Sequence, residues 1–304
     1  MPLSTNSLVN RLVGATTIKF WAWASLISQI LIVVTGGLVR LTGSGLGCPT
    51  WPKCTQENLV TVPEQGIHGL IEFGNRLLTF VLLIIAVGTL ITVLRKRAQP
   101  VRSARALAIV LFLGIPAQAV LGGFTVWSKL NPWFVGAHFM LSGIMIIVAT
   151  VLVWRVYSPA AAVVPALAFA LAPVISVFGV IAVIVGVLVT GAGPHSGDAQ
   201  SPRNGLDLEI WQHYHSYPAY LLLLLVLIQW LTLQRTDRTE GGKRSWSLTT
   251  RISFALLLTI VAQACVGVAQ ARLGVPAGLV LVHMLLASCL ISLITFNFLA
   301  SRAK

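Results

Sequence analysis

Residues 117–120 read Ala-Gln-Ala-Val, and residues 262–265 read Ala-Gln-Ala-Cys. A histidine stands twenty residues after each glutamine, His138 in the first copy and His283 in the second. The copies are 145 residues apart in a chain of 304 residues. An offset of about half the chain length is typical of a duplicated structural unit. The sequence therefore predicts two related halves, each with a histidine at the same place.

A second pair of segments supports the duplication. Residues 38–45 read Leu-Val-Arg-Leu-Thr-Gly-Ser-Gly, and residues 188–193 read Leu-Val-Thr-Gly-Ala-Gly. The Thr-Gly pairs in these segments are 148 residues apart, close to the first offset.

The composition is that of an integral membrane protein. Hydrophobic residues make up 56% of the chain and charged residues only 10%, which is unlike a soluble domain of this size. A helix that spans a bilayer needs about 20 mostly apolar residues. Eight stretches meet this requirement, near residues 20–41, 70–94, 106–127, 133–157, 166–190, 210–233, 251–272 and 277–300. They are continuously apolar and do not alternate, which argues against a β-barrel. We expect an all-α protein with eight transmembrane helices and no cleavable signal peptide.

The net charge of +13 is distributed as an orientation signal. With both termini on the cytoplasmic side, 15 of the 21 lysines and arginines are cytoplasmic. This positive-inside bias predicts that the N and C termini are both cytoplasmic. The outer side then holds Arg40, Lys53, Arg76, Lys129, Arg203 and Arg272. The partner that we expect for these basic residues is therefore anionic lipid of the bilayer, and nucleic acid is not expected.

Four helices per half is an even number, so both halves enter the membrane in the same direction. We expect two parallel four-helix repeats, related by an axis along the membrane normal. The Ala/Pro-rich stretch at 158–165 divides them into an N-terminal half, residues 1–160, and a C-terminal half, residues 161–304.

Two of the four cysteines differ from the others in their surroundings. Cys48 and Cys54 are six residues apart in a Gly/Pro/Trp-rich outer loop, where an oxidising environment favours a disulfide. A zinc site is not expected, because no second pair has ligand spacing. Whether the bridge is structural or redox-active stays open. Cys265 and Cys289 lie in apolar helices and are most simply small core residues.

Histidines stand near the outer ends of several predicted helices. His138 and His283 occupy matching places, and His215 opens another helix of the second half. Interhelical hydrogen bonding is the simpler interpretation for one isolated histidine. For a pair at equal depth in a four-helix unit we favour haem, with His215 and His283 as the two axial ligands. His213 cannot share the face of His215, because residues two apart point in different directions on a helix.

The helix that carries His215 differs from its counterpart in the first half. Residues 72–76 align with residues 212–216, which places Asn75 over His215 and Glu72 over Gln212. The first half thus replaces a ligand with an amide and adds a carboxylate one turn earlier. Either Glu72 performs chemistry or it forms a salt bridge, for example with Arg76.

Arg40 and Arg76 lie near the outer ends of the first two helices. They are candidates for binding haem propionates. Interfacial snorkelling is the alternative for each of them.

Four features together resemble the haem A synthase family, of the bacterial type with a cysteine pair in the first extracytoplasmic loop. They are Gly37–Gly45, the Cys48/Cys54 loop, Ile71-Glu72-Phe73-Gly74-Asn75-Arg76 and Gly136-Ala137-His138. The resemblance covers nearly the whole chain, including the duplicated eight-helix plan.

The resemblance implies an oxidoreductase of the bacterial cell membrane that converts haem O into haem A for terminal oxidases. Two successive hydroxylations of the C8 methyl group give a geminal diol, which loses water to leave a formyl group. It also implies a b-type haem held by His215 and His283 in the second half. In the first half, His138 would ligate the substrate haem, and Glu72 would be the essential carboxylate. Implied partners are haem O synthase (the protohaem farnesyltransferase), cytochrome oxidase assembly and an unidentified electron acceptor.

The chain departs from the family pattern at Asn75, where many members carry histidine. Either His138 ligates the substrate haem alone, or His68 supplies a second ligand. His68 lies seven residues before Asn75, which is about 10 Å along a helix.

Two other functions compete with this interpretation. A membrane b-type cytochrome that only carries electrons would need matched ligand pairs in both halves, which Asn75 and Glu72 argue against. A transporter would need charged groups near the middle of the membrane, whereas here the polar groups gather at the outer edge.

Overall fold

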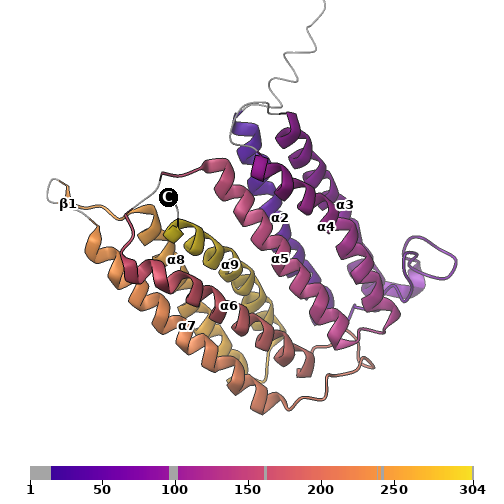
Figure 1. Ribbon diagram of the computed structural model, residues 1–304. Helices are drawn as coiled ribbons and strands as arrows, with labels where there is room; N and C mark the ends of the chain where they lie inside the picture. The colour runs from indigo at the N-terminus through magenta and orange to yellow at the C-terminus, as the bar shows by residue number, and fades with distance from the viewer. Residues whose placement is uncertain (1–14, 96–101, 161–162, 238, 241–242, 303–304) are drawn as a thin grey trace, which may run out of the picture.

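The computed structural model describes residues 15–95, 102–160, 163–237, 239–240 and 243–302 (Figure 1). Eight long helices dominate this part of the chain: α2 (Ala15–Leu41), α3 (Gly66–Arg95), α4 (Arg102–Trp127), α5 (Pro132–Tyr157), α6 (Ala166–Ala192), α7 (Leu208–Thr236), α8 (Leu248–Arg272) and α9 (Ala277–Arg302). All eight are long and apolar enough to cross a membrane, so the prediction of eight spanning helices is confirmed. The remaining elements are a short 3-10 helix, η1 (Pro63–Gln65), and two-residue strands, β1 (Thr239–Glu240) and β2 (Lys243–Arg244).

The helices pack as two rings of four. In the first ring α2 contacts α3, α3 contacts α4, α4 contacts α5, and α5 returns to α2. Helices α6 to α9 repeat this order in the second ring, and the two rings lie side by side (Figure 1). The rings meet where α5 and α2 contact α9 and where α5 contacts α6. In each ring the second and fourth helices stand at opposite corners.

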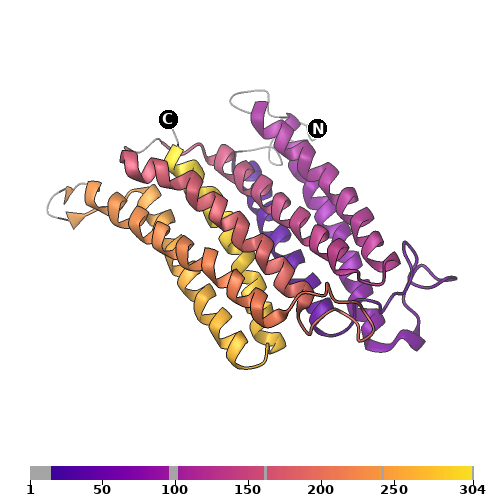
Figure 2. The same ribbon diagram turned by 60° about the horizontal axis from the view of Figure 1, so that its bottom comes forward.

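Alternating helix directions bring four connections to one end of the molecule. The segments 42–65, 128–131, 193–207 and 273–276 lie at this end, which we call the loop end. The first turn of α2 and the last turn of α9 lie at the opposite end (Figure 2). The assignment of the loop end to the outer side of a membrane, the parallel relation of the two halves and the domain boundary stay predictions. Residues 1 and 304, the predicted outer limits of the two halves, are outside the described residues.

Each ring has its own buried core. Leu111, Met145 and Leu152 are among the fully buried side chains of the first core, and Ile175, Val226 and Leu256 are among those of the second. Small polar side chains add hydrogen bonds between helices, as expected in a membrane interior. The Ser25 and Thr89 hydroxyls are 2.9 Å apart within the first ring, and Thr150 donates to Ser292 across the two rings at 2.9 Å.

Many large apolar side chains lie on the outer surface of the bundle. Phe20, Phe80 and Ile84 are each 64% exposed, which suits contact with lipid chains. Cys265 belongs to this surface and is exposed, so the expectation that it packs in the core is wrong. A helix that is apolar all round carries no signal for which of its faces is buried.

Candidate cofactor sites

His215 and His283 approach each other inside the second ring. His215 lies about two turns into α7 and His283 about two turns into α9, at opposite corners of the ring. Their ring centroids are 6.3 Å apart, with the planes inclined at 68°. The Nδ1 atom of each ring is buried and has no hydrogen-bond partner. The sequence predicted that these two residues form a pair, and the structure brings them together.

The spacing of these imidazoles fits a shared metal ion. Two rings that ligate one ion have centres about 6 Å apart, because each metal–nitrogen bond is about 2 Å long and each ring nitrogen lies about 1 Å from the ring centre. Glycines make room beside both rings. A Cβ atom added at Gly186 would lie 2.9 Å from Cε1 of His215, and one at Gly267 would lie 3.3 Å from Cε1 of His283. The two imidazoles, and the space that the glycines leave beside them, both suit a group ligated by two histidines.

The first ring holds one imidazole in the same setting. His138 lies about two turns into α5, and its Nδ1 atom is also buried without a partner. A Cβ atom added at Gly122 would lie 3.4 Å from its Cε1 atom, which matches Gly267 and His283. Asn75 lies on α3, at the corner opposite α5, and its Oδ1 atom is buried and unpaired. This half offers one nitrogen ligand and one amide oxygen.

Two glutamines that the sequence analysis left without a role contact the histidine helices. Gln118 Nε2 donates to the backbone carbonyl of His138 at 3.4 Å, and Gln263 Nε2 donates to that of His283 at 3.2 Å. The repeated Ala-Gln-Ala motif was the available signal, since both glutamines precede their histidines by the same number of residues.

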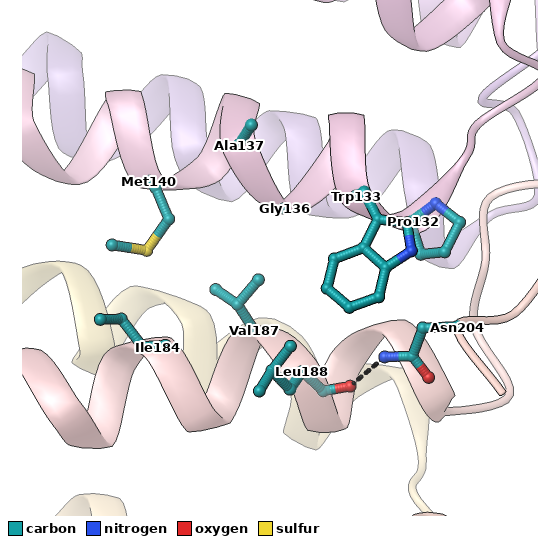
Figure 3. A pocket seen from close by; sticks show the side chains of 9 residues that line it. All are labelled: Pro132, Trp133, Gly136, Ala137, Met140, Ile184, Val187, Leu188 and Asn204. Atoms are coloured by element: carbon teal, nitrogen blue, oxygen red, sulfur yellow. Dashed lines mark hydrogen bonds between the residues drawn. The ribbon is translucent and has the colours of Figure 1, made fainter. Parts of the chain in front are cut away.

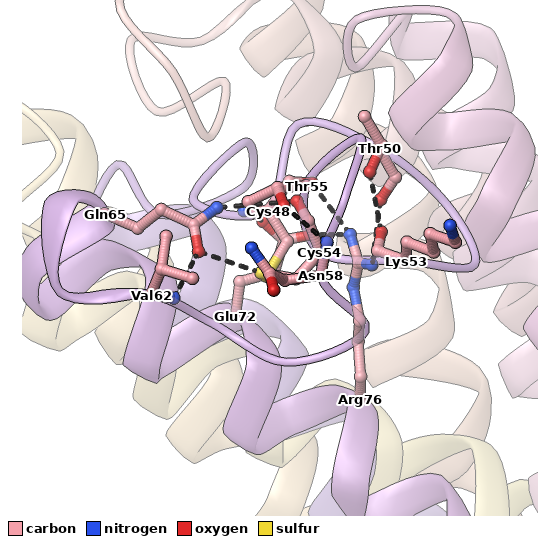
Figure 4. The surroundings of a disulfide bond; sticks show 10 residues. All are labelled: Cys48, Thr50, Lys53, Cys54, Thr55, Asn58, Val62, Gln65, Glu72 and Arg76. Carbon is pink, nitrogen blue, oxygen red and sulfur yellow. Dashed lines mark hydrogen bonds and ion pairs between the residues drawn. A yellow bond between two sulfur atoms is a disulfide. The ribbon is translucent and has the colours of Figure 1, made fainter.

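Glu72 and Arg76 hold the disulfide loop against α3 (Figure 4). Glu72 is only 6% exposed, forms a 2.5 Å ion pair with Arg76, and accepts a 2.6 Å hydrogen bond from the backbone N–H of Cys48. Arg76 donates to the backbone carbonyls of Cys48 at 2.8 Å, Thr50 at 2.9 Å and Lys53 at 3.3 Å. The sequence left open whether Glu72 performs chemistry or forms a salt bridge, and the structure contains the salt bridge with Arg76. The ion pair leaves Glu72 on α3, one turn from Asn75, so it does not exclude a chemical role.

The predicted disulfide between Cys48 and Cys54 is confirmed, and both cysteines are fully buried. The loop also packs on α4 through Trp51. Its ring lies 5.3 Å from that of Trp127, edge to face, and its backbone carbonyl accepts a 3.3 Å hydrogen bond from Trp127 Nε1. A Cβ atom at Gly123 would overlap the Trp51 ring. The loop is therefore fixed by α3 on one side and α4 on the other.

The other candidate residues have structural partners. Arg40 Nη2 donates to the backbone carbonyl of Thr190 at 2.7 Å, which joins α2 to α6. His68 is exposed, and its Nδ1 atom is 2.9 Å from the hydroxyl of Ser44 in the Thr-Gly-Ser-Gly segment. His195, in the connection between α6 and α7, is half-buried, with Nε2 2.8 Å from the carbonyl of Val275.

A separate apolar cavity of about 180 Å³ lies between α5 and α6 (Figure 3). Trp133, Met140 and Val187 extend into it, and Asn204 donates to the carbonyl of Leu188 at 2.8 Å beside it. It contains no acid and no histidine.

Among the described residues, no group of three or more His, Cys, Asp or Glu side chains could hold a metal ion. The histidines of α5, α7 and α9 are therefore the candidates for ligation.

Comparison with protein families now adds to this geometry. A family model described as cytochrome oxidase assembly protein (COX15-CtaA) matches residues 19–295. The chain belongs to this family. The match covers all eight helices in whole or in large part, so the resemblance predicted from the sequence motifs is confirmed at the level of the family.

Several curated relatives are haem A synthases by name. The one from Listeria welshimeri is 26% identical over 309 residues, which covers 94% of this chain and 96% of the relative. The one from Listeria monocytogenes serovar 1/2a is 26% identical over 314 residues with the same coverage. The one from Geobacillus thermodenitrificans is 36% identical over 121 residues, where the match spans 40% of this chain and 37% of the relative's length.

Proposed function

We propose that this protein is a haem A synthase of the bacterial cell membrane. It oxidises the C8 methyl group of haem O by two successive hydroxylations, and the resulting geminal diol loses water to give the formyl group of haem A. Membership of the cytochrome oxidase assembly family and the printed names of its relatives support the class of reaction. The single observation that carries the proposal is the contrast between the paired histidines of the second half and the Glu72/Asn75 pair of the first.

The second half holds a b-type haem through His215 and His283. The 6.3 Å separation of the two rings and the glycines beside them support this role. When bound, the haem iron supplies one-electron redox chemistry, and the protein supplies position and electrostatics.

The first half receives haem O, with His138 as its single imidazole ligand. Asn75 leaves the opposite side of the site without a nitrogen ligand, and His68, an exposed residue two turns earlier on α3, does not replace it in this proposal. Arg76 is engaged by Glu72 and three loop carbonyls, and Arg40 by Thr190. Their remaining N–H groups are available to the propionates of the substrate.

Glu72 is the catalytic carboxylate in this proposal. A carboxylate beside the reacting methyl group accepts a proton or stabilises positive charge that develops there. The contacts from Arg76 and from the Cys48 N–H orient the carboxylate. The partners of the reaction are haem O synthase, which supplies the substrate, an electron acceptor, and the cytochrome oxidase that receives haem A.

A membrane b-type cytochrome without haem-modifying activity is the second candidate function. The His215–His283 geometry alone would serve it equally well. It gives no reason for the buried, unpaired amide of Asn75 at the position that aligns with His215.

The test is haem extraction and chromatography from membranes that contain this chain, with and without a haem O synthase. We expect haem A only when both proteins are present. Haem b in the purified protein, together with unchanged haem O in the same membranes, would favour the electron carrier and overturn the proposal.

A further inference from the structure

The contacts of Gln118 and Gln263 form a three-residue arrangement that is present in both halves. On α4, Gln118 and Gly122 are four residues apart and face α5, and on α8, Gln263 and Gly267 are four residues apart and face α9. In each pair the glutamine contacts the backbone of the histidine and the glycine lies beside its ring. The first copy has one additional contact, because Gln118 Nε2 also donates to the Ser142 hydroxyl at 2.7 Å. All three members are repeated at the same offset of 145 residues.

Each copy contains two buried polar atoms that lack a partner. These are the carboxamide oxygen Oε1 of the glutamine and the ring nitrogen Nδ1 of the histidine. Buried polar atoms are nearly always hydrogen-bonded, either to protein or to an ordered water. Oε1 can only accept a hydrogen bond, while Nδ1 carries the proton whenever the other ring nitrogen is a metal ligand. The two orphan atoms therefore have complementary chemistry and lie on neighbouring helices.

A histidine that ligates a metal almost always donates its second ring N–H to an acceptor, which fixes the ring and raises its basicity. We propose that Gln118 and Gln263 are equivalent positioning residues for the haem-ligating histidines. The NH2 group of each glutamine holds the backbone of the histidine. Its Oε1 atom accepts the Nδ1–H hydrogen bond, directly or through one buried water. This inference rests on the proposed function, because it assigns the acceptor for the ligands of that same site.

The test compares Gln263→Glu and Gln263→Leu in the haem-loaded protein, by redox titration of the b-type haem. A carboxylate acceptor makes the ligand imidazole more basic and favours the oxidised iron, whereas leucine removes the acceptor. We expect the midpoint potential to fall in Gln263→Glu and to rise in Gln263→Leu. Haem b affinity should drop by about 10-fold to 100-fold in the leucine variant.

Gln118→Leu is the matched control, because it removes the same side chain from the other half. It should leave the midpoint potential of haem b unchanged and weaken retention of haem O. A glutamine that only held the helix in place would not shift the potential in opposite directions with glutamate and leucine. Haem-loaded variants with the wild-type potential would overturn the inference alone. A wild-type protein without haem b would overturn the proposed function as well.

Discussion

Glu72 is the residue on which the proposed difference in role between the two halves depends most. Its carboxylate is buried, paired with Arg76 and bonded to the backbone N–H of Cys48. The aligned residue in the second half is Gln212, so one half carries a charge where the other carries an amide. The same side chain therefore both supports the loop and supplies a negative charge at the proposed substrate site.

Replacing Glu72 with glutamine separates these two roles. The amide oxygen can still accept from Cys48 N–H, but the charge is lost. We expect Glu72→Gln to retain haem and to form haem A about a hundredfold more slowly, which is within the range for loss of a general acid–base group. Glu64→Gln, at an exposed position of η1, is the matched control and should behave as wild type. Normal haem A yield from Glu72→Gln would exclude the catalytic role.

Among the elements, the loop between α2 and α3 owes its position to several contacts besides the disulfide. Arg76 donates to three of its carbonyls, and Trp51 packs on Trp127 of α4. A hydrogen bond of this kind is worth about 1 kcal/mol, and somewhat less where it is exposed, as the one to Lys53 is. Together the three contribute about as much as a short-loop disulfide, which is worth about 2 kcal/mol.

Removing the arginine should therefore loosen this loop at least as much as removing the bridge. We expect trypsin to cut at Lys53 faster in Arg76→Ala than in the double variant Cys48→Ser/Cys54→Ser. Limited proteolysis in detergent, followed by mass spectrometry, measures this. Cleavage that speeds up only in the cysteine variant would show that the disulfide alone orders the loop.

Helices α8 and α9 meet at a glycine beside His283. A valine at Gly267 would push its side chain into the ring, because even a Cβ atom there lies 3.3 Å from Cε1. We expect Gly267→Val to reduce haem b affinity by about 10-fold or more, as changes around metal ligands commonly do. Gly278→Val on α9 is the control, since a Cβ atom there has no neighbour within 4 Å. Equal haem b content in the two variants, measured from pyridine haemochrome spectra, would contradict the proposed position of the ligand.

The helices themselves could be predicted from the sequence because a bilayer imposes a length that local composition reveals. The spans, the duplicated histidines and the Cys48–Cys54 bridge follow from such local patterns. Other features depend on contacts between distant residues. Three features are of this kind, and no short-range pattern encodes them: the exposure of Cys265, the hydrogen bond between His195 and the Val275 carbonyl, and the hydrogen bonds from Arg76 to the loop.

At the scale of the whole molecule, the two rings share the same helix order but only part of their site residues. The Gln-Gly-His arrangement is present in both rings, whereas the residues on α3 and α7 that face it have diverged. All of these residues lie within about three turns of the loop end. The two candidate sites therefore lie at the same end of the molecule, in neighbouring rings, which would suit electron transfer between the haems that we propose for them.

The most direct test of this division is the haem content of two single variants, His138→Ala and His215→Ala, purified from membranes that also contain haem O synthase. We predict that His215→Ala loses haem b and still retains haem O, while His138→Ala retains haem b and loses haem O. Wild-type haem b content in His215→Ala, or loss of haem b from His138→Ala alone, would contradict the assignment of one haem to each half.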